Sequence, residues 1–169
     1  MAALDLARLY DDHAAALYAY ALNLTRSESD AGDVLQEVFT RLARRGELPS
    51  DLREPRALLL RMAHHAVVDS LRRRESRRRA AESLAAESGT LFAPAPDPDA
   101  AAFRNGLAAA LGELPAAQRA VVHLKLWEGL TFEQIAGTLD LSPNTAASRY
   151  RYGIDKLRAQ LRPLYEEIR

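Results

Sequence analysis

The sequence contains no cysteine, which excludes disulfide bonds, cysteine-ligated zinc and thiol catalysis. It also lacks any apolar run approaching the ~20 residues of a membrane-spanning helix, so we expect no membrane insertion. The first residues include acids where a secretory signal would have a basic start and an apolar block, which favours a cytoplasmic protein. With 48% hydrophobic and 27% charged residues, the 169-residue chain has the composition of a globular protein.

Constellations typical of catalysis are missing as well. The sequence shows no nucleophile–base pair, no glycine-rich phosphate loop and no cluster of metal ligands at helical spacing. His64 and His65 are adjacent and would point two ways around a helix, which makes them a poor metal site. We therefore expect no enzyme, with no catalytic residues, no metal and no cofactor.

The net charge is zero, but the charges are arranged in opposed blocks. Eight arginines lie between Arg56 and Arg79, against two acids, whereas residues 80–103 hold four acids and no base. A basic block of this kind favours contact with phosphate groups, although such a run is also common in flexible surface tails.

Helical periodicity dominates the chain and predicts an all-α fold. We expect a helix or helix pair at 4–24, a helix closed by Gly46, and a third helix that starts at Pro55 and runs into the arginines. A second group begins with a short helix from Phe103, followed by a helix at 117–128 with Trp127 in the core, and ends in a frayed segment from Pro163. These elements form two small helical domains, 1–79 and 103–169, joined by a flexible acidic, proline-containing linker at 80–102.

The segment 130–157 is typical of a helix-turn-helix. Thr131 and Gln134 form a capping box, Ser142 is an N-cap, and Pro143 occupies the first helical position. An ordinary antiparallel helix pair would share this pattern. DNA recognition is favoured because the exposed face of the second helix carries short hydrogen-bonding groups and arginine, which suit base edges and phosphates. The candidate DNA-contacting residues are Ser142, Asn144, Thr145, Ser148, Arg149, Arg151 and Tyr152.

Two further surfaces are predicted in the first domain. The second helix has a polar, partly acidic face with Phe39 at its edge, which indicates protein docking with Phe39 as the anchor, or else a solvated face with Phe39 half in the core. The candidates for docking are Asp33, Gln36, Glu37 and Phe39. The outer face of the third helix supplies the candidates for contact with DNA: Arg61, His65, Asp69, Arg72 and Arg73.

Three stretches together resemble the bacterial RNA polymerase sigma factors of the extracytoplasmic-function (ECF) group. DAGDVLQEVFTRL is similar to the family's helix that binds core polymerase, and PRALLLRMAHHAVVDSLRRR to its promoter-melting helix. ELPAAQRAVVHLKLWEGLTFEQIAGTLDLSPNTAASRYRYGIDKLR is similar to its C-terminal domain. Leu58 and His65 stand where the family often has Trp and Asn.

The resemblance implies a promoter-specificity subunit that binds the largest-subunit clamp and the flap of core RNA polymerase. The second helix would contact polymerase, the third would hold and melt the −10 element, and the helix-turn-helix would read the −35 element. An anti-sigma protein is a further partner consistent with two small tethered domains. The alternative is a DNA-binding regulator or sigma mimic that does not melt promoters, for which Leu58 and His65 are the main support.

Overall fold

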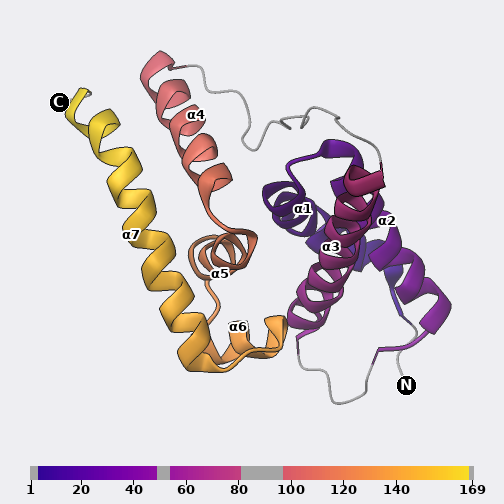
Figure 1. Cartoon of the computed structure of the whole chain (residues 1–169). Coiled ribbons are helices and arrows are strands. Elements are labelled where there is room, and N and C mark those ends of the chain that lie inside the picture. Colours follow the sequence, from indigo (N-terminus) through magenta and orange to yellow (C-terminus); the bar gives the residue numbers. More distant parts are fainter. Residues whose placement is uncertain (1–3, 49–53, 81–96, 168–169) are drawn as a thin grey trace. The chain divides into compact units, whose positions relative to one another are not determined.

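The computed structural model describes residues 4–48, 54–80 and 97–167, and within these ranges all regular structure is helical (Figure 1). The chain divides into two compact units, Met1–Gly89 and Thr90–Arg169. The all-α class with two helical units is therefore confirmed. Most of the predicted linker lies outside the described residues. The helices are α1 (Leu6–Thr25), α2 (Glu28–Arg45), α3 (Pro55–Ala80), α4 (Pro98–Glu113), α5 (Ala116–Leu126), α6 (Phe132–Leu139) and α7 (Pro143–Glu167).

The first unit consists of α1, α2 and α3, and each of these helices packs against the other two. The segment predicted as a helix or helix pair is the single helix α1. As expected, Pro55 opens α3 and Gly46 caps α2 with a positive φ of 72°. The core of this unit combines fully buried aliphatic side chains of all three helices, among them Leu17, Val34, Val38, Leu42, Leu59, Leu60 and Val67.

A buried polar contact links α1 to α3. The Tyr20 hydroxyl, on a residue with 0% exposure, lies 2.9 Å from Nδ1 of His64. Burial raises the pKa of Tyr20 above the ordinary tyrosine value, so the hydroxyl keeps its proton. His64 thus faces the core while His65 is exposed, which confirms that the two adjacent imidazoles point in different directions.

The second unit is organised around α7, which packs against α4, α5 and α6. One core cluster joins α4, α5 and α7 through Ala110, Leu111, Leu114, Val122 and Leu157, with Leu107, Tyr150, Ile154 and Leu161 packed at its edge. On α6, Ile135, Ala136 and Leu139 are buried. Gly129 has the predicted positive φ, 65°, in the turn after α5.

Both ends of this unit are more helical than expected. Helix α4 begins at Pro98 rather than near Phe103, because Asp97 caps it and accepts a hydrogen bond from the Asp99 amide at 3.1 Å. Helix α7 continues through Pro163 to Glu167, where fraying was predicted. The extension packs against α4: the rings of Phe103 and Tyr165 are 6.5 Å apart, edge to face.

The predicted core position of Trp127 is wrong. Its side chain is 41% exposed, and its ring stacks on His123 at 5.3 Å between centroids. The physical reason is that Trp127 is the C-cap at the end of α5, beyond the buried Leu124, where its ring covers His123 of the preceding turn and does not enter the core.

Candidate functional site

The helix-turn-helix has the predicted local geometry. Thr131 Oγ1 accepts a hydrogen bond from the Gln134 amide at 3.2 Å, and Gln134 Oε1 accepts one from the Thr131 amide at 2.9 Å. These two bonds complete the capping box of α6. Asp140 turns the chain with a φ of 55°, and Ser142 Oγ accepts from the Thr145 amide at 3.1 Å to cap α7. The predicted starts of both helices and their caps are confirmed.

Small residues allow α7 to lie close to its neighbours. Ala146 has 0% exposure, and Gly153 is buried against α5. A Cβ atom added to Gly153 would lie only 2.7 Å from Cγ2 of Val122. This side of α7 is therefore fixed to the rest of the unit, and the opposite side faces outward.

We define the α7 face as the seven residues predicted to contact DNA at the start of this helix. Ser142, Asn144, Thr145, Arg151 and Tyr152 are exposed, and Ser148 and Arg149 are half-buried. The Arg151 guanidinium lies 5.4 Å from the centre of the Tyr152 ring, and Ser142 Oγ is 2.9 Å from Thr145 Oγ1. No acid occupies the first turn of α7, so the positive helix end is open to anions.

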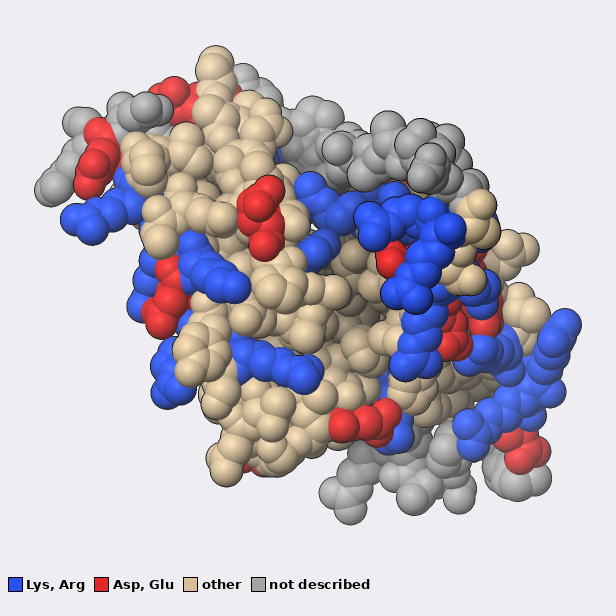
Figure 2. Space-filling model, viewed as in Figure 1, with Lys and Arg blue, Asp and Glu red and all other residues tan. Residues whose placement is uncertain are grey.

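A second candidate surface runs along α3, where Figure 2 shows Lys and Arg side chains gathered. We call the five residues predicted to contact DNA here the α3 stripe. Arg61, His65, Arg72 and Arg73 are exposed and Asp69 is half-buried, while Leu59, Ala63, Ala66, Val67 and Ser70 face the core. The five residues predicted on the outer face of this helix are therefore accessible to solvent, Asp69 in part.

The arginine side chains at the end of α3 do not all point in the same direction. Arg78 and Arg79 pair with Glu75 of the same helix at 3.3 and 3.2 Å. Arg74 is half-buried and bonds to the end of α1 instead. Sequence reasoning, which treated the run as one basic stripe, missed this orientation.

The third candidate surface lies on α2 and consists of Asp33, Gln36 and Glu37, which we call the α2 face. Asp33 and Gln36 are exposed, and Glu37 is half-buried and forms an ion pair with Arg41 one helical turn further on. These positions agree with the predicted polar face.

Of the two interpretations of that surface, the structure favours the one that places Phe39 in the core. Its side chain is 8% exposed and belongs to the core, so it is not an exposed anchor. Its ring packs on Tyr10 of α1 at 4.9 Å between centroids, and Tyr10 is 48% exposed. The exposed aromatic beside the α2 face is therefore Tyr10, whose exposure the sequence pattern did not predict.

The described residues contain no group of three or more His, Cys, Asp or Glu side chains that could hold a metal ion. Within the same part of the chain, every helix is too short or too polar to cross a membrane.

Comparison with known proteins identifies both units. Residues 9–77 match the family model described as Sigma-70 region 2, and residues 104–157 match the model described as Sigma-70, region 4. The chain is 37% identical over 158 residues to the ECF RNA polymerase sigma factor SigL of Mycobacterium tuberculosis, covering 92% of this chain and 88% of SigL. It is 30% identical to the RNA polymerase sigma factor CarQ of Myxococcus xanthus, with 95% and 91% coverage.

A solved structure shares the fold. The sigma factor RpoE, crystallised in complex with the anti-sigma factor NepR from Bartonella quintana, matches with a TM-score of 0.77 at 20% identity, covering 94% of this chain and 97% of that one. None of these similarities supports the alternative of a regulator that does not melt promoters. Two sigma-70 regions in the expected order, together with sigma factor relatives that match over most of their length, show that the chain belongs to the ECF family of RNA polymerase sigma factors.

Proposed function

We propose that the chain is a promoter-specificity subunit, which binds core RNA polymerase and directs transcription initiation at promoters with −35 and −10 elements. The observation that carries this proposal is the match of residues 9–77 and 104–157 to sigma-70 regions 2 and 4. We propose that it acts in the cytoplasm and has no catalytic activity of its own. In this role residues 1–79 bind polymerase and the −10 element, residues 103–169 bind the −35 element, and residues 80–102 connect them.

In the proposed mechanism, the α7 face lies in the major groove of the −35 element. Asn144, Ser148 and Arg151 are of the residue types that read base edges, and hydroxyl groups near the helix start suit phosphate oxygens. The hydrogen-bonded pair Ser142–Thr145 holds its hydroxyls at the N-terminus of α7, where the helix dipole favours an anion. This arrangement supports recognition of duplex DNA by α7.

The α3 stripe is proposed to hold the −10 element as it opens. Separating a base pair and unstacking its bases costs a few kcal/mol. Cationic side chains that bind the single-strand backbone offset this cost. Arg61, Arg72 and Arg73 are exposed along one side of α3, which supports this role.

Reconstituted transcription tests the proposal directly. Core RNA polymerase supplemented with this chain is expected to initiate at discrete promoters, and permanganate is expected to modify unpaired thymines near each start site. Activity no greater than that of core enzyme alone would refute the proposal. Initiation complexes that bind promoters without permanganate-reactive thymines would instead indicate a sigma mimic.

Tyr10 is the proposed anchor of the contact between α2 and polymerase, because it is the exposed aromatic beside the α2 face. Tyr10→Ala is expected to weaken binding to core polymerase by ~1 kcal/mol or more, as interface anchors do. Binding of a fluorescently labelled chain to core enzyme measures this loss. Arg8→Ala is the matched control, because Arg8 is exposed on the same helix and forms an ion pair with Asp12, one turn further along that helix. Equal affinity for both variants would remove Tyr10 from the interface.

Arg149 is the proposed phosphate contact of the α7 face. Arg149→Ala is expected to weaken binding to −35 DNA and to reduce the slope of log affinity against log salt by about one unit. Titration of promoter DNA with the reconstituted holoenzyme at several salt concentrations gives this slope. Arg162→Ala is the control, because Arg162 lies about 20 Å further along the helix and pairs with Glu166. An unchanged slope for Arg149→Ala would rule out the phosphate contact.

An anti-sigma protein is the proposed further partner. The structurally similar protein CnrH, 24% identical to this chain, was solved in complex with the cytosolic domain of CnrY. Co-purification of the chain from its native lysate, followed by mass spectrometry, tests for an inhibitor that competes with core polymerase.

A further inference from the structure

Arg74 lies on the side of α3 that faces away from the α3 stripe. At about 100° per residue, Arg74 is rotated roughly 200° from Arg72, which belongs to the stripe. Arg74 is half-buried, whereas Arg72 and Arg73 are exposed. Arg74 therefore points away from the surface proposed to bind DNA.

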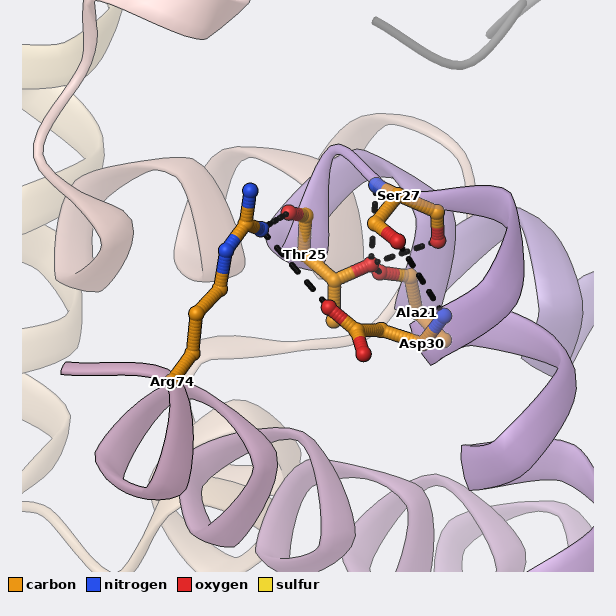
Figure 3. A network of polar contacts seen from close by, with 5 residues as sticks. All are labelled: Ala21, Thr25, Ser27, Asp30 and Arg74. Carbon is orange, nitrogen blue, oxygen red and sulfur yellow. Dashed lines mark hydrogen bonds and ion pairs between the residues drawn. The ribbon is translucent and has the colours of Figure 1, made fainter. Parts of the chain in front are cut away.

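Arg74 reaches the corner where α1 ends and α2 begins (Figure 3). Its Nη1 atom donates a hydrogen bond of 2.9 Å to the carbonyl oxygen of Thr25, the last residue of α1. The same atom lies 3.7 Å from Oδ2 of Asp30, in the first turn of α2. One guanidinium thus joins three helices.

The corner is suited to a cation and is itself held in place. The C-terminal end of α1 carries partial negative charge, and Asp30 adds a carboxylate. Thr25 Oγ1 donates to the Ala21 carbonyl at 2.8 Å, and Ser27 Oγ accepts from the Asp30 amide at 3.2 Å. Thr25 and Ser27 are 2% and 7% exposed, so the acceptor of the Arg74 bond is buried in a rigid turn.

The last turns of α3 depend on such an attachment. Ser70 is the last buried residue of α3 and Leu71 is half-buried, and residues 72–80, which are arginine, glutamate, serine and alanine, gain little from apolar packing. Arginines at a spacing of four residues, such as Arg73 and Arg77, repel each other and destabilise a helix. The pairs that Glu75 forms with Arg78 and Arg79 stay within α3 and do not connect it to another helix.

We infer that Arg74 is a positioning residue, which anchors the last turns of α3 to the α1–α2 corner and so keeps Arg72 and Arg73 oriented for promoter opening. Arg74 itself does not contact DNA. The inference rests on the proposed function, because it assigns to Arg74 the task of preparing the α3 stripe before DNA arrives. Without the anchor, the helix end must be ordered at the moment of binding, which lowers affinity.

Hydrogen exchange of the free chain tests the anchor. Arg74→Ala is expected to speed exchange of amides in residues 71–80 by about tenfold, the size expected from losing a hydrogen bond to a charged group. Amides in the middle of α1 and α2 are expected to keep their rates. Arg78→Ala is the matched control: it removes an arginine from the same run, but one paired only within α3, and is expected to leave exchange unchanged.

Promoter opening by the holoenzyme tests the consequence. Arg74→Ala is expected to reduce the affinity for open promoter DNA, measured by permanganate reactivity, by about fivefold to tenfold while the salt slope stays the same. Arg73→Ala, which removes a proposed phosphate contact, is expected to reduce both the affinity and the slope. Arg74→Lys keeps a cation at the corner. Its exchange rates and its promoter affinity are expected to fall between those of the unsubstituted chain and those of Arg74→Ala. If the alanine variant does not fold, the lysine variant replaces it in both measurements.

Three results would overturn the inference. These are unchanged exchange in residues 71–80, an equal loss of protection throughout α1 and α2, or a salt slope reduced by about one unit, which would mean a direct phosphate contact. Failure of the proposed function looks different, since the unsubstituted chain would then open no promoter, while the exchange measurement would still report on the anchor.

Discussion

Gly153→Val is expected to unfold much of the second unit and to abolish binding of the −35 element. Gly153 is buried where α7 crosses α5, and even a Cβ atom there would lie 2.7 Å from Cγ2 of Val122 and 3.6 Å from Cβ of Gln118. Val122 has 0% exposure, so its side chain is enclosed by other residues and cannot move out into solvent. Overpacking a core costs about 1–3 kcal/mol, and two further methyl groups place valine at the upper end.

Because the second unit is small, this loss of stability is expected to unfold much of it. Domains of this length bury only about 60% of the surface of the unfolded chain and are marginally stable. A loss of ~3 kcal/mol is therefore a large fraction of the total stability. Urea denaturation followed by circular dichroism, with binding of −35 DNA as a second readout, measures the effect.

Two glycine-to-alanine variants separate the effect of packing from that of helix propensity. Gly137 is also in a helix of this unit, but an added Cβ there meets nothing within 4 Å. Gly137→Ala is expected to stabilise the unit by roughly 0.5–1 kcal/mol, because alanine is the better helix former. Gly153→Ala has the same gain in helix propensity, but we expect the close contact with Val122 to cancel the resulting stabilisation. Combining it with Val122→Ala, which shortens that neighbour, is expected to restore part of the lost stability. Equal stabilisation by both alanines would show that α7 and α5 are not tightly packed.

The helix-turn-helix was predictable from the sequence because its signals are local. Thr131, Gln134, Ser142 and Pro143 act within one helical turn, so residue type and spacing determine their hydrogen bonds. The outward face of α7 followed for the same reason, since its buried side is marked by Ala146, Gly153 and Leu157.

The features that the sequence did not predict depend on contacts between helices. Tyr10 and Phe39 are aromatics at the border of two amphipathic helices, and which of them is exposed is decided by how α1 packs on α2. Arg74 has the same residue type as its neighbours in the run, and only the position of the α1–α2 corner distinguishes it. The extension of α7 past Pro163 likewise depends on packing against Phe103 of α4.

Arg119→Ala is the other substitution expected to have a large effect. Arg119 is 8% exposed, and its Nη2 atom donates a 2.9 Å hydrogen bond to the carbonyl oxygen of Leu114, which is 2% exposed. Leu114 is the C-cap of α4 and Pro115 is the N-cap of α5, so the guanidinium spans the corner between the two helices. This hydrogen bond gives a structural reason for an arginine at position 119.

The alanine variant removes a charged donor from a buried carbonyl oxygen. A buried acceptor left unsatisfied costs about 1–3 kcal/mol, and the space vacated by the long side chain adds to this loss. We therefore expect a loss of ~3 kcal/mol in the free energy of unfolding of the second unit, measured by urea denaturation, with weaker −35 binding as the consequence.

Two companion variants identify the cause of that loss. Arg119→Met keeps most of the side-chain volume and removes the donor, so it isolates the hydrogen bond. We expect it to show more than half of the loss in the free energy of unfolding caused by Arg119→Ala, because the Leu114 carbonyl stays buried. Arg158→Ala, at a side chain that is 78% exposed and pairs with Asp155 at 3.9 Å, is expected to change stability by no more than ~0.5 kcal/mol. If Arg119→Met were as stable as the unsubstituted chain, packing alone would hold the α4–α5 corner, and the bond to Leu114 would contribute nothing to it.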